Sequence, residues 1–459
     1  MTISLCAALC HAPEATPVPV TALKKDAYNS WLEKAPAATR QWLQATGFEA
    51  KAGASRLIPE KDGSLARVLI ILEEEPSLWD LASLPSLLQD GFFRLENAHG
   101  VENLLALGWL LGGYHFTPPK TQKGTPTLCV SKSCAIEDIE RQALAIAQAQ
   151  KLITLPAEEM GPEELAQEVQ KTGKKHGAKI KIIVGDALLK KNYPAIHAIG
   201  RASHRAPRLI DLQWGSSKHP LLTLVGKGVC FDTGGLDLKP PAGMYLMRKD
   251  MAGAAVALGL AGLIMAEKLP VRLRLLISAV DNSINERALR PTDIVTMRNG
   301  LKVEIGNTDA EGRMILADAL SEAASQNPDL VIDFGTLGVS RSIFGVDMAS
   351  FFTKDDALAK VLYDSAQETQ DYLWRMPLHP PYAKKLKTPF ADINSSPRVS
   401  FGHGMIAGAF LESFTKNVRA LHIDFYGWYD SAQAGRPEGG AAQTMRAAFN
   451  MLKKRYTRV

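Results

Sequence analysis

The chain has 459 residues, of which 46% are hydrophobic and 22% are charged, which is ordinary usage for a globular protein. At about 100–200 residues per domain, this length allows two or three domains with sizeable cores. The net charge of +5 is mild and the basic clusters are short, so we do not expect nucleic acid as a partner.

The cysteines and the N-terminal segment bear on the cellular compartment. Five cysteines form an odd count without closely spaced zinc-type pairs, which indicates reduced thiols and a cytoplasmic protein. Residues 1–12 are apolar but lack the basic segment of a secretory signal. No run approaches the roughly 18 uninterrupted apolar residues of a membrane-spanning helix, so we expect no membrane association.

Residues 1–150 are expected to form a smaller, accessory α/β domain. The apolar patterns predict strands at 65–72 and 128–130 and helices at 101–113 and 136–154. The proline pair at 118–119, followed by Gly124, predicts a loop. This part contains no chemical cluster, and we expect three of its larger polar or aromatic side chains to be packing residues: Trp109, Tyr114 and His115.

Residues 151–459 alternate strand and helix patterns and are expected to form the catalytic domain. The expected helices lie at 163–176, 186–191 and 253–268, and the expected strands at 179–184, 209–214, 221–229, 271–281, 330–334 and 420–425. Such alternation predicts an α/β fold with a mixed, largely parallel sheet flanked by helices. Ligands of such sheets bind beyond the carboxyl ends of the strands, so the loops there are the informative ones.

Residues 307–320 combine charge with a buried helix. The pattern from Met314 onward predicts the helix, and Asp309, Glu311 and Arg313 alternate just before it. If this segment is extended, the three side chains share one face and could bind a cation and an anion side by side. The alternative is an ordinary helix start, with one of residues 307–309 as N-cap and Glu311 complementing the helix dipole.

A second acidic stretch follows the predicted strand 221–229. Lys227 lies near the end of that strand, where an unpaired ammonium would be unusual. Asp232 and Lys239 follow, and Asp250 lies just before the helix expected at residue 253. Taken singly, these residues also have ordinary interpretations as a turn former, a solvated lysine and a helix N-cap.

Taken together, the two stretches predict a metal centre. Four carboxylates would repel one another strongly unless cations lay among them: Asp232, Asp250, Asp309 and Glu311. Two divalent metal ions would satisfy them and could activate water and polarise a carbonyl or phosphoryl oxygen. Lys227, if neutral, could serve as a nitrogen ligand. Lys239 could face a developing oxyanion, and Arg313 could clamp a carbonate-like anion.

Three segments resemble the leucyl aminopeptidase family, the cytosol aminopeptidases. Residues 307–313 (Asn-Thr-Asp-Ala-Glu-Gly-Arg) are similar to the family's signature heptapeptide. Residues 226–235 (Gly-Lys-Gly-Val-Cys-Phe-Asp-Thr-Gly-Gly) resemble its metal-binding loop, and residues 247–251 (Met-Arg-Lys-Asp-Met) its next acidic turn. The resemblance extends from about residue 145 to the C-terminus.

The resemblance implies an aminopeptidase that removes N-terminal residues from peptides with two divalent cations, Mn²⁺, Zn²⁺ or Mg²⁺. It implies that the tightly bound metal has four ligands, Lys227, Asp232, Asp250 and Glu311. It implies that the exchangeable metal has three, Asp232, Asp309 and Glu311. Lys239 would polarise the scissile carbonyl during attack by a metal-bridged hydroxide. Arg313 would hold a bicarbonate that acts as general base. A cytoplasmic homohexamer is implied as well.

The substrate pocket departs from the family pattern. Where the family usually has Ala-Thr-Leu-Thr-Gly-Ala, residues 335–340 are Gly-Thr-Leu-Gly-Val-Ser. Thr336 and Leu337 are retained, and with Met247 they are the expected substrate-binding residues. Gln433 stands where the family often has an apolar residue.

Two other functions could use the same fold or the same clustered acids. A two-metal phosphoester hydrolase would usually add histidine ligands, but neither acidic stretch contains one, and we expect His403 and His422 to be structural. A non-catalytic DNA-binding or scaffold protein of the same fold would require a basic stripe in residues 1–160, and the sequence shows none there.

Overall fold

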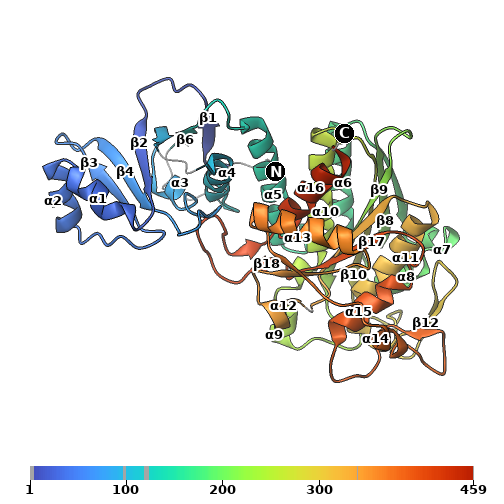
Figure 1. Cartoon of the computed structure of the whole chain (residues 1–459). Helices are drawn as coiled ribbons and strands as arrows, with labels where there is room; N and C mark the ends of the chain where they lie inside the picture. Colours follow the sequence, from blue (N-terminus) through green and yellow to red (C-terminus); the bar gives the residue numbers. More distant parts are fainter. Residues whose placement is uncertain (1–4, 97–99, 118–123, 339, 458–459) are drawn as a thin grey trace. The chain divides into compact units, whose positions relative to one another are not determined.

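The computed structural model describes residues 5–96, 100–117, 124–338 and 340–457 (Figure 1). The chain forms two compact units, the first of residues 1–147 and 431–438, the second of residues 148–430 and 439–459. The division falls within helix α5 (Ile136–Thr154), whose bounds equal those predicted from the sequence. The proline pair at 118–119 lies outside the described residues.

The first unit is built on a six-stranded sheet among its described residues, in the order β1-β6-β5-β2-β4-β3. Neighbouring strands are parallel except β3 and β4. The strands are β1 (Ala8–Cys10), β2 (Val18–Leu23), β3 (Ser55–Pro59), β4 (Leu65–Ile71), β5 (Gly91–Leu95) and β6 (Pro126–Cys129). Besides α5, the helices are α1 (Ala27–Lys34), α2 (Ala37–Ala45), α3 (Leu84–Leu87) and α4 (Glu102–Gly112). The strands and helices predicted in this part are thus confirmed within a few residues.

Helix α4 is apolar on nearly all sides because it is buried. Trp109 is fully buried and its ring lies 6.0 Å from that of Phe93, so its predicted packing role is confirmed. Gly108 allows α4 to pack closely against the segment before α3, because a Cβ at Gly108 would lie 1.7 Å from the carbonyl oxygen of Leu78. Any larger residue at this position would push α4 away from that segment.

The second unit contains an eight-stranded mixed sheet among its described residues, in the order β15-β14-β17-β13-β9-β10-β8-β7. The central strands β17, β13, β9 and β10 are parallel. The strands are β7 (Lys179–Val184), β8 (Arg208–Trp214), β9 (Leu221–Asp232), β10 (Arg272–Asn282), β13 (Leu330–Gly335), β14 (Ala349–Phe352), β15 (Leu373–Arg375) and β17 (Ala420–Asp424). Short strands outside this sheet are β11 (Ile294–Thr296), β12 (Lys302–Glu304), β16 (Ile393–Asn394), β18 (Trp428–Tyr429) and β19 (Gly439–Gly440).

Helices flank the sheet of the second unit (Figure 1). They are α6 (Pro162–Lys175), α7 (Ala187–Lys190), α8 (Pro194–Gly200), α9 (Pro241–Met244), α10 (Ala252–Ala266), α11 (Glu311–Ser325), α12 (Ser340–Phe344), α13 (Asp356–Thr369), α14 (Pro380–Lys384), α15 (His403–Glu412) and α16 (Met445–Tyr456), with 3₁₀ turns η1 (Met247–Met251) and η2 (Thr308–Ala310). The predicted α/β class is confirmed, and the pairs β10–β8, β8–β7 and β17–β14 supply its antiparallel part.

Strand β9 is the centre of this unit. Eleven of its twelve residues are buried, as expected for a parallel strand covered on both faces. The small residues of α10 allow that helix to pack closely, since a Cβ at Gly226 would lie 2.6 Å from the Cα of Ala254. The stretch Met247–Ala266 is long and apolar enough to span a membrane, but 89% of its apolar window is buried, as in a core helix. The strand extends to Asp232, so the predicted end at residue 229 was wrong, and Lys227 lies inside the strand.

Candidate metal centre

Lys227 projects from β9 into a buried cluster of carboxyl groups. Its side chain is 3% exposed, and its Nζ lies 2.8 Å from Asp250 Oδ2 and 3.1 Å from Glu311 Oε1. It also donates a hydrogen bond of 3.0 Å to the carbonyl oxygen of Thr336. Burial lowers the pKa of Lys227, but Asp250 and Glu311 outweigh that effect and raise the pKa above its ordinary value. As an ammonium, Lys227 therefore ties together η1, α11 and the segment after β13.

Asp232 ends β9 and meets a second lysine. Lys239 Nζ lies 2.9 Å from Asp232 Oδ2 and 2.5 Å from Asp309 Oδ1. The other oxygen of Asp232 accepts 2.8 Å hydrogen bonds from Asn282 Nδ2 and from the Gly234 amide. Sequence reasoning missed Asn282, which pairs in register with Asp232 in the neighbouring strand; only knowledge of the strand order could have found it.

The segment before α11 is not extended, so the predicted alternation of Asp309, Glu311 and Arg313 on one extended face is wrong. Residues 308–310 form the turn η2, and α11 begins at Glu311. The Asn307 side chain caps η2 by accepting a 2.7 Å hydrogen bond from the Asp309 amide, as the alternative interpretation expected.

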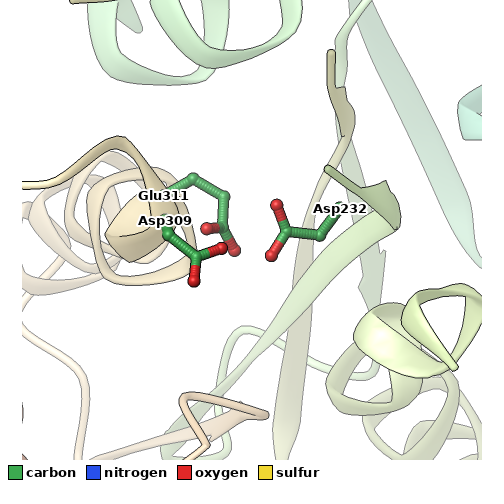
Figure 2. A group of neighbouring side chains, drawn as sticks. All are labelled: Asp232, Asp309 and Glu311. Atoms are coloured by element: carbon green, nitrogen blue, oxygen red, sulfur yellow. The ribbon is translucent and has the colours of Figure 1, made fainter. Parts of the chain in front are cut away.

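Three carboxylates nevertheless converge. Asp232, Asp309 and Glu311 each place an oxygen within 4.8 Å of the others, and Figure 2 shows Asp232 facing the other two across a small gap. Glu311 is 2% exposed, and its Oε2 has no hydrogen-bond partner among the described residues. A buried, unpartnered carboxylate oxygen beside two further carboxylates is a donor set that fits a divalent cation.

The electrostatics of the cluster point the same way. Burial, and then the neighbouring charges of Glu311 and Asp250, raise the pKa of Asp232 well above its ordinary value. Burial also raises the pKa of Asp250 to about 6, although Lys227 opposes the shift. Burial raises the pKa of Glu311 too, but the two lysines outweigh it and lower that pKa below its ordinary value. Asp232 and Asp250 therefore resist ionisation, a penalty that a bound divalent cation would remove.

Arg313 is the third residue of α11, two positions after Glu311. Its Nη1 donates a 2.8 Å hydrogen bond to the carbonyl oxygen of Ser395. Its Nε is buried and has no partner in the described part of the chain. Burial lowers the pKa of Arg313 to about 10, against the opposing charges of Glu311 and Asp424. A buried guanidinium with an unused donor fits a small anion.

A cavity of about 380 Å³ joins these groups. All the sequence-predicted site residues line it: Lys227, Asp232, Lys239, Met247, Asp250, Asp309, Glu311, Arg313, Thr336 and Leu337. Thr336 is fixed by a 2.7 Å hydrogen bond from its hydroxyl to Asp250 Oδ1, and the Leu337 amide donates a 2.6 Å hydrogen bond to Asp424 Oδ1. His422, expected to be structural, is not part of this wall; it pairs with Asp333 at 2.5 Å.

Sequence reasoning missed the further wall residues that have polar side chains, Lys249, Arg341 and Tyr426. They come from three separated segments; Lys249 lies in the family-like segment 247–251, but only its neighbours Met247 and Asp250 were predicted to act there. Only the fold, which places the residues after β13 and β17 beside η1, could reveal them.

Comparison with known sequences decides the family. The profile of the cytosol aminopeptidase family, catalytic domain, matches residues 147–449, and that of the M17 aminopeptidase, N-terminal domain, matches residues 18–129. The chain belongs to the cytosol aminopeptidase family. It is thus a metallopeptidase of the aminopeptidase class, and the resemblance noted in the sequence is confirmed.

Named relatives agree. The chain is 37% identical over 367 residues to a probable cytosol aminopeptidase of Brucella anthropi, covering 76% of this chain and 72% of the relative. It is 38% identical over 328 residues to peptidase B of an Enterobacter species, covering 69% and 77% of the two chains. Both relatives carry peptidase names, as the family assignment requires.

Solved structures match both units of this aminopeptidase. The crystal structure of a cytosol aminopeptidase from Coxiella burnetii matches with a TM-score of 0.92 and 42% identity, over 98% of this chain and 99% of the other. The bottromycin maturation enzyme BotP in complex with Mn matches with a TM-score of 0.86 and 25% identity, over 96% and 100% of the two chains.

Proposed function

We propose that this aminopeptidase releases N-terminal amino acids from peptides with the help of two divalent cations, Mn²⁺ first among them, with Zn²⁺ and Mg²⁺ as alternatives. The observation that carries the proposal is the convergence of three carboxylates within 4.8 Å, one with an unpartnered buried oxygen, in a cavity that also presents a lysine and an arginine. The Mn complex of BotP, a related fold, supports the choice of metal.

The ligand sets are those that the family resemblance implies, and the contacts of Lys227 with Asp250 and Glu311 support the first of them. Lys227, once it loses its proton, would join three acids at one ion: Asp232, Asp250 and Glu311. The second ion would take Asp232, Asp309 and Glu311, which each place an oxygen within 4.8 Å of the others. Bound there, divalent cations supply acidified water and a polarised carbonyl.

The chain's own side chains would do the remaining work. Lys239 contacts Asp232 and Asp309 in this structure, and its ammonium would turn to the oxygen of the scissile carbonyl when cations take those carboxylates. The unused Nε of Arg313 would hold bicarbonate, which would accept the proton of the attacking water. The Leu337 carbonyl would accept a hydrogen bond from the substrate or from water, and Met247 and Thr336 would form walls of the pocket.

The cellular form of the enzyme belongs to the same proposal. We expect a cytoplasmic homohexamer, as the family resemblance implies. Analytical ultracentrifugation of the purified chain tests the assembly: a single species near six times 49.9 kDa supports it, and a monomer at micromolar concentration contradicts it.

A reconstitution assay tests the proposed reaction. The full chain is stripped with a chelator, reloaded with each metal, and given leucine amide and its N-acetylated counterpart. Hydrolysis that requires metal and a free amine supports the proposal. Equal hydrolysis of the acetylated amide would contradict an aminopeptidase, and full turnover by the stripped protein would contradict the metal centre.

A further inference from the structure

One wall of the cavity carries an aromatic ring that contacts two basic side chains. Lys249 Nζ lies 4.3 Å from the centre of the Tyr426 ring, and Arg341 Cζ lies 4.5 Å from it. All three residues line the same cavity as the carboxylate cluster. The contacts are within cation–π range, so the ring holds both cations at fixed positions.

Lys249 differs from the other two lysines of the cavity. It is 4% exposed, and its Nζ donates a 2.7 Å hydrogen bond to the carbonyl oxygen of Tyr426. Lys227 and Lys239 each lie within 3.1 Å of two carboxylates, whereas none of the ion pairs in the described part of the chain includes Lys249. A buried ammonium with only a carbonyl and a ring as partners has unused capacity for an anion.

Arg341 lies on α12, at the more open side of the ring. Its side chain is 54% exposed, and its Nη2 lies 3.1 Å from Asp430 Oδ2. The Tyr426 hydroxyl donates a 3.3 Å hydrogen bond to the other oxygen of Asp430, so one acid orients both the ring and the guanidinium. The pair with Asp430 uses one edge of the guanidinium, which has five N–H donors in a planar fork.

We propose that Lys249 and Arg341 form a cationic subsite that binds a carboxylate of the peptide substrate. The subsite deepens the proposed aminopeptidase function and rests on it. Two sources supply this chemistry: the side chain of an N-terminal Glu or Asp, and the C-terminal carboxylate of a dipeptide. A cavity of about 380 Å³ accommodates either, because small-molecule sites begin at about 300 Å³.

The experiment compares charged substrates with neutral isosteres on the Mn²⁺-loaded full chain. Glutamyl p-nitroanilide is compared with glutaminyl p-nitroanilide, and Leu-Gly with Leu-Gly amide. We expect kcat/KM to favour the charged member of one pair by about tenfold, the lower end for hydrogen bonds to charged groups. The pair that shows the preference identifies which carboxylate is bound.

Variants assign the preference to the two side chains. Arg341→Gln and Lys249→Met should each bring the ratio of kcat/KM within the preferred pair toward one. Arg290→Gln is the matched control, since Arg290 is 71% exposed and pairs with Asp293 at the same 3.1 Å but does not line the cavity. It should leave the ratio unchanged. If Lys249→Met lowers the melting temperature, the exposed Arg341→Gln variant carries the test.

The outcomes separate the subsite from the reaction. Turnover of the neutral substrates with no preference for either carboxylate overturns the subsite and leaves the aminopeptidase function standing. A preference that survives both substitutions also overturns it, because Lys249 and Arg341 then serve only to fix the Tyr426 ring. Absence of turnover with every substrate, leucine p-nitroanilide included, overturns the proposed function and the subsite with it.

Discussion

The packing of Gly312 against Lys227 gives the sharpest prediction for stability. Gly312 is the second residue of α11, and a Cβ built on it would lie 2.4 Å from Lys227 Cε, 2.6 Å from its Nζ and 2.8 Å from its Cδ. The Gly312→Ala substitution therefore requires Lys227 to move. Lys227 is buried, so its side chain has little free space in which to do so.

The expected loss in the free energy of unfolding follows from the contacts that such a movement of Lys227 breaks. The ammonium of Lys227 would leave Asp250 at 2.8 Å and Glu311 at 3.1 Å, both of them buried. Removing one partner of a buried ion pair costs about 3–5 kcal/mol. Alanine is favoured over glycine within a helix by up to about 1 kcal/mol, which opposes this loss. We expect Gly312→Ala to destabilise the metal-free protein by about 2–4 kcal/mol.

Calorimetric unfolding of the metal-free full chain measures the effect on the catalytic unit. Gly262→Ala is the matched control, because Gly262 lies in α10 and a Cβ there would meet only Thr172 Cγ2, at an ordinary 3.7 Å. That variant should be as stable as the wild type or more so. If Gly312→Ala also melts at or above the wild-type temperature, the close packing of Lys227 against α11 is refuted.

Three further predictions concern the metal and the C-terminal helix. Asp309→Ala and Glu311→Ala should each abolish both Mn²⁺ binding in titration calorimetry and turnover; full turnover by both variants would contradict the ligand assignment. Chelation should lower the melting temperature of the catalytic unit as well as its activity, since ligands of the native state add stability that their removal takes away, whereas an unchanged melting curve would argue against buried ions. Partial burial raises the pKa of Asp329, but Tyr456 and Arg455 outweigh it and hold the pKa below its ordinary value. The stability from Asp329 is therefore present above its unfolded pKa and lost as the pH falls through the folded value. Asp329→Asn should reduce the loss of stability at acid pH by less than about 1 kcal/mol, because the side chains of the Arg455–Asp329 pair are about one-third exposed. The same loss of stability at acid pH in the variant and the wild type would contradict this prediction.

Much of the fold could be predicted because strong local patterns decided it. The helix α5 and the strand β7 have the bounds that periodicity indicated, since an uninterrupted amphipathic or alternating pattern with a clear stop leaves few alternatives. Strand β9 was predicted too short, because residues 230–232 read as a loop beside two glycines, whereas Phe231 and Asp232 pair with β10. Tertiary pairing overrode the local signal there.

The residues of the candidate metal centre were predictable in kind but not in geometry. Clustered acids signalled a cation, yet the extended face proposed for Asp309 and Glu311 is a 3₁₀ turn leading into a helix. Residues that reach the site only through tertiary contacts had no recognisable pattern in the sequence. Asn282 reaches Asp232 through strand register, and Lys249 meets Arg341 only through the ring of Tyr426.

The central claim is that acids from three separate segments hold a pair of divalent cations. The most direct measurement is an anomalous difference map from a crystal of the chain grown with Mn²⁺. Two peaks are expected among the carboxyl groups of Asp232, Asp250, Asp309 and Glu311. Lys227 Nζ should lie at bonding distance from one of the two peaks. A map without peaks there, or one in which Lys227 keeps its ion pair with Asp250, would contradict it.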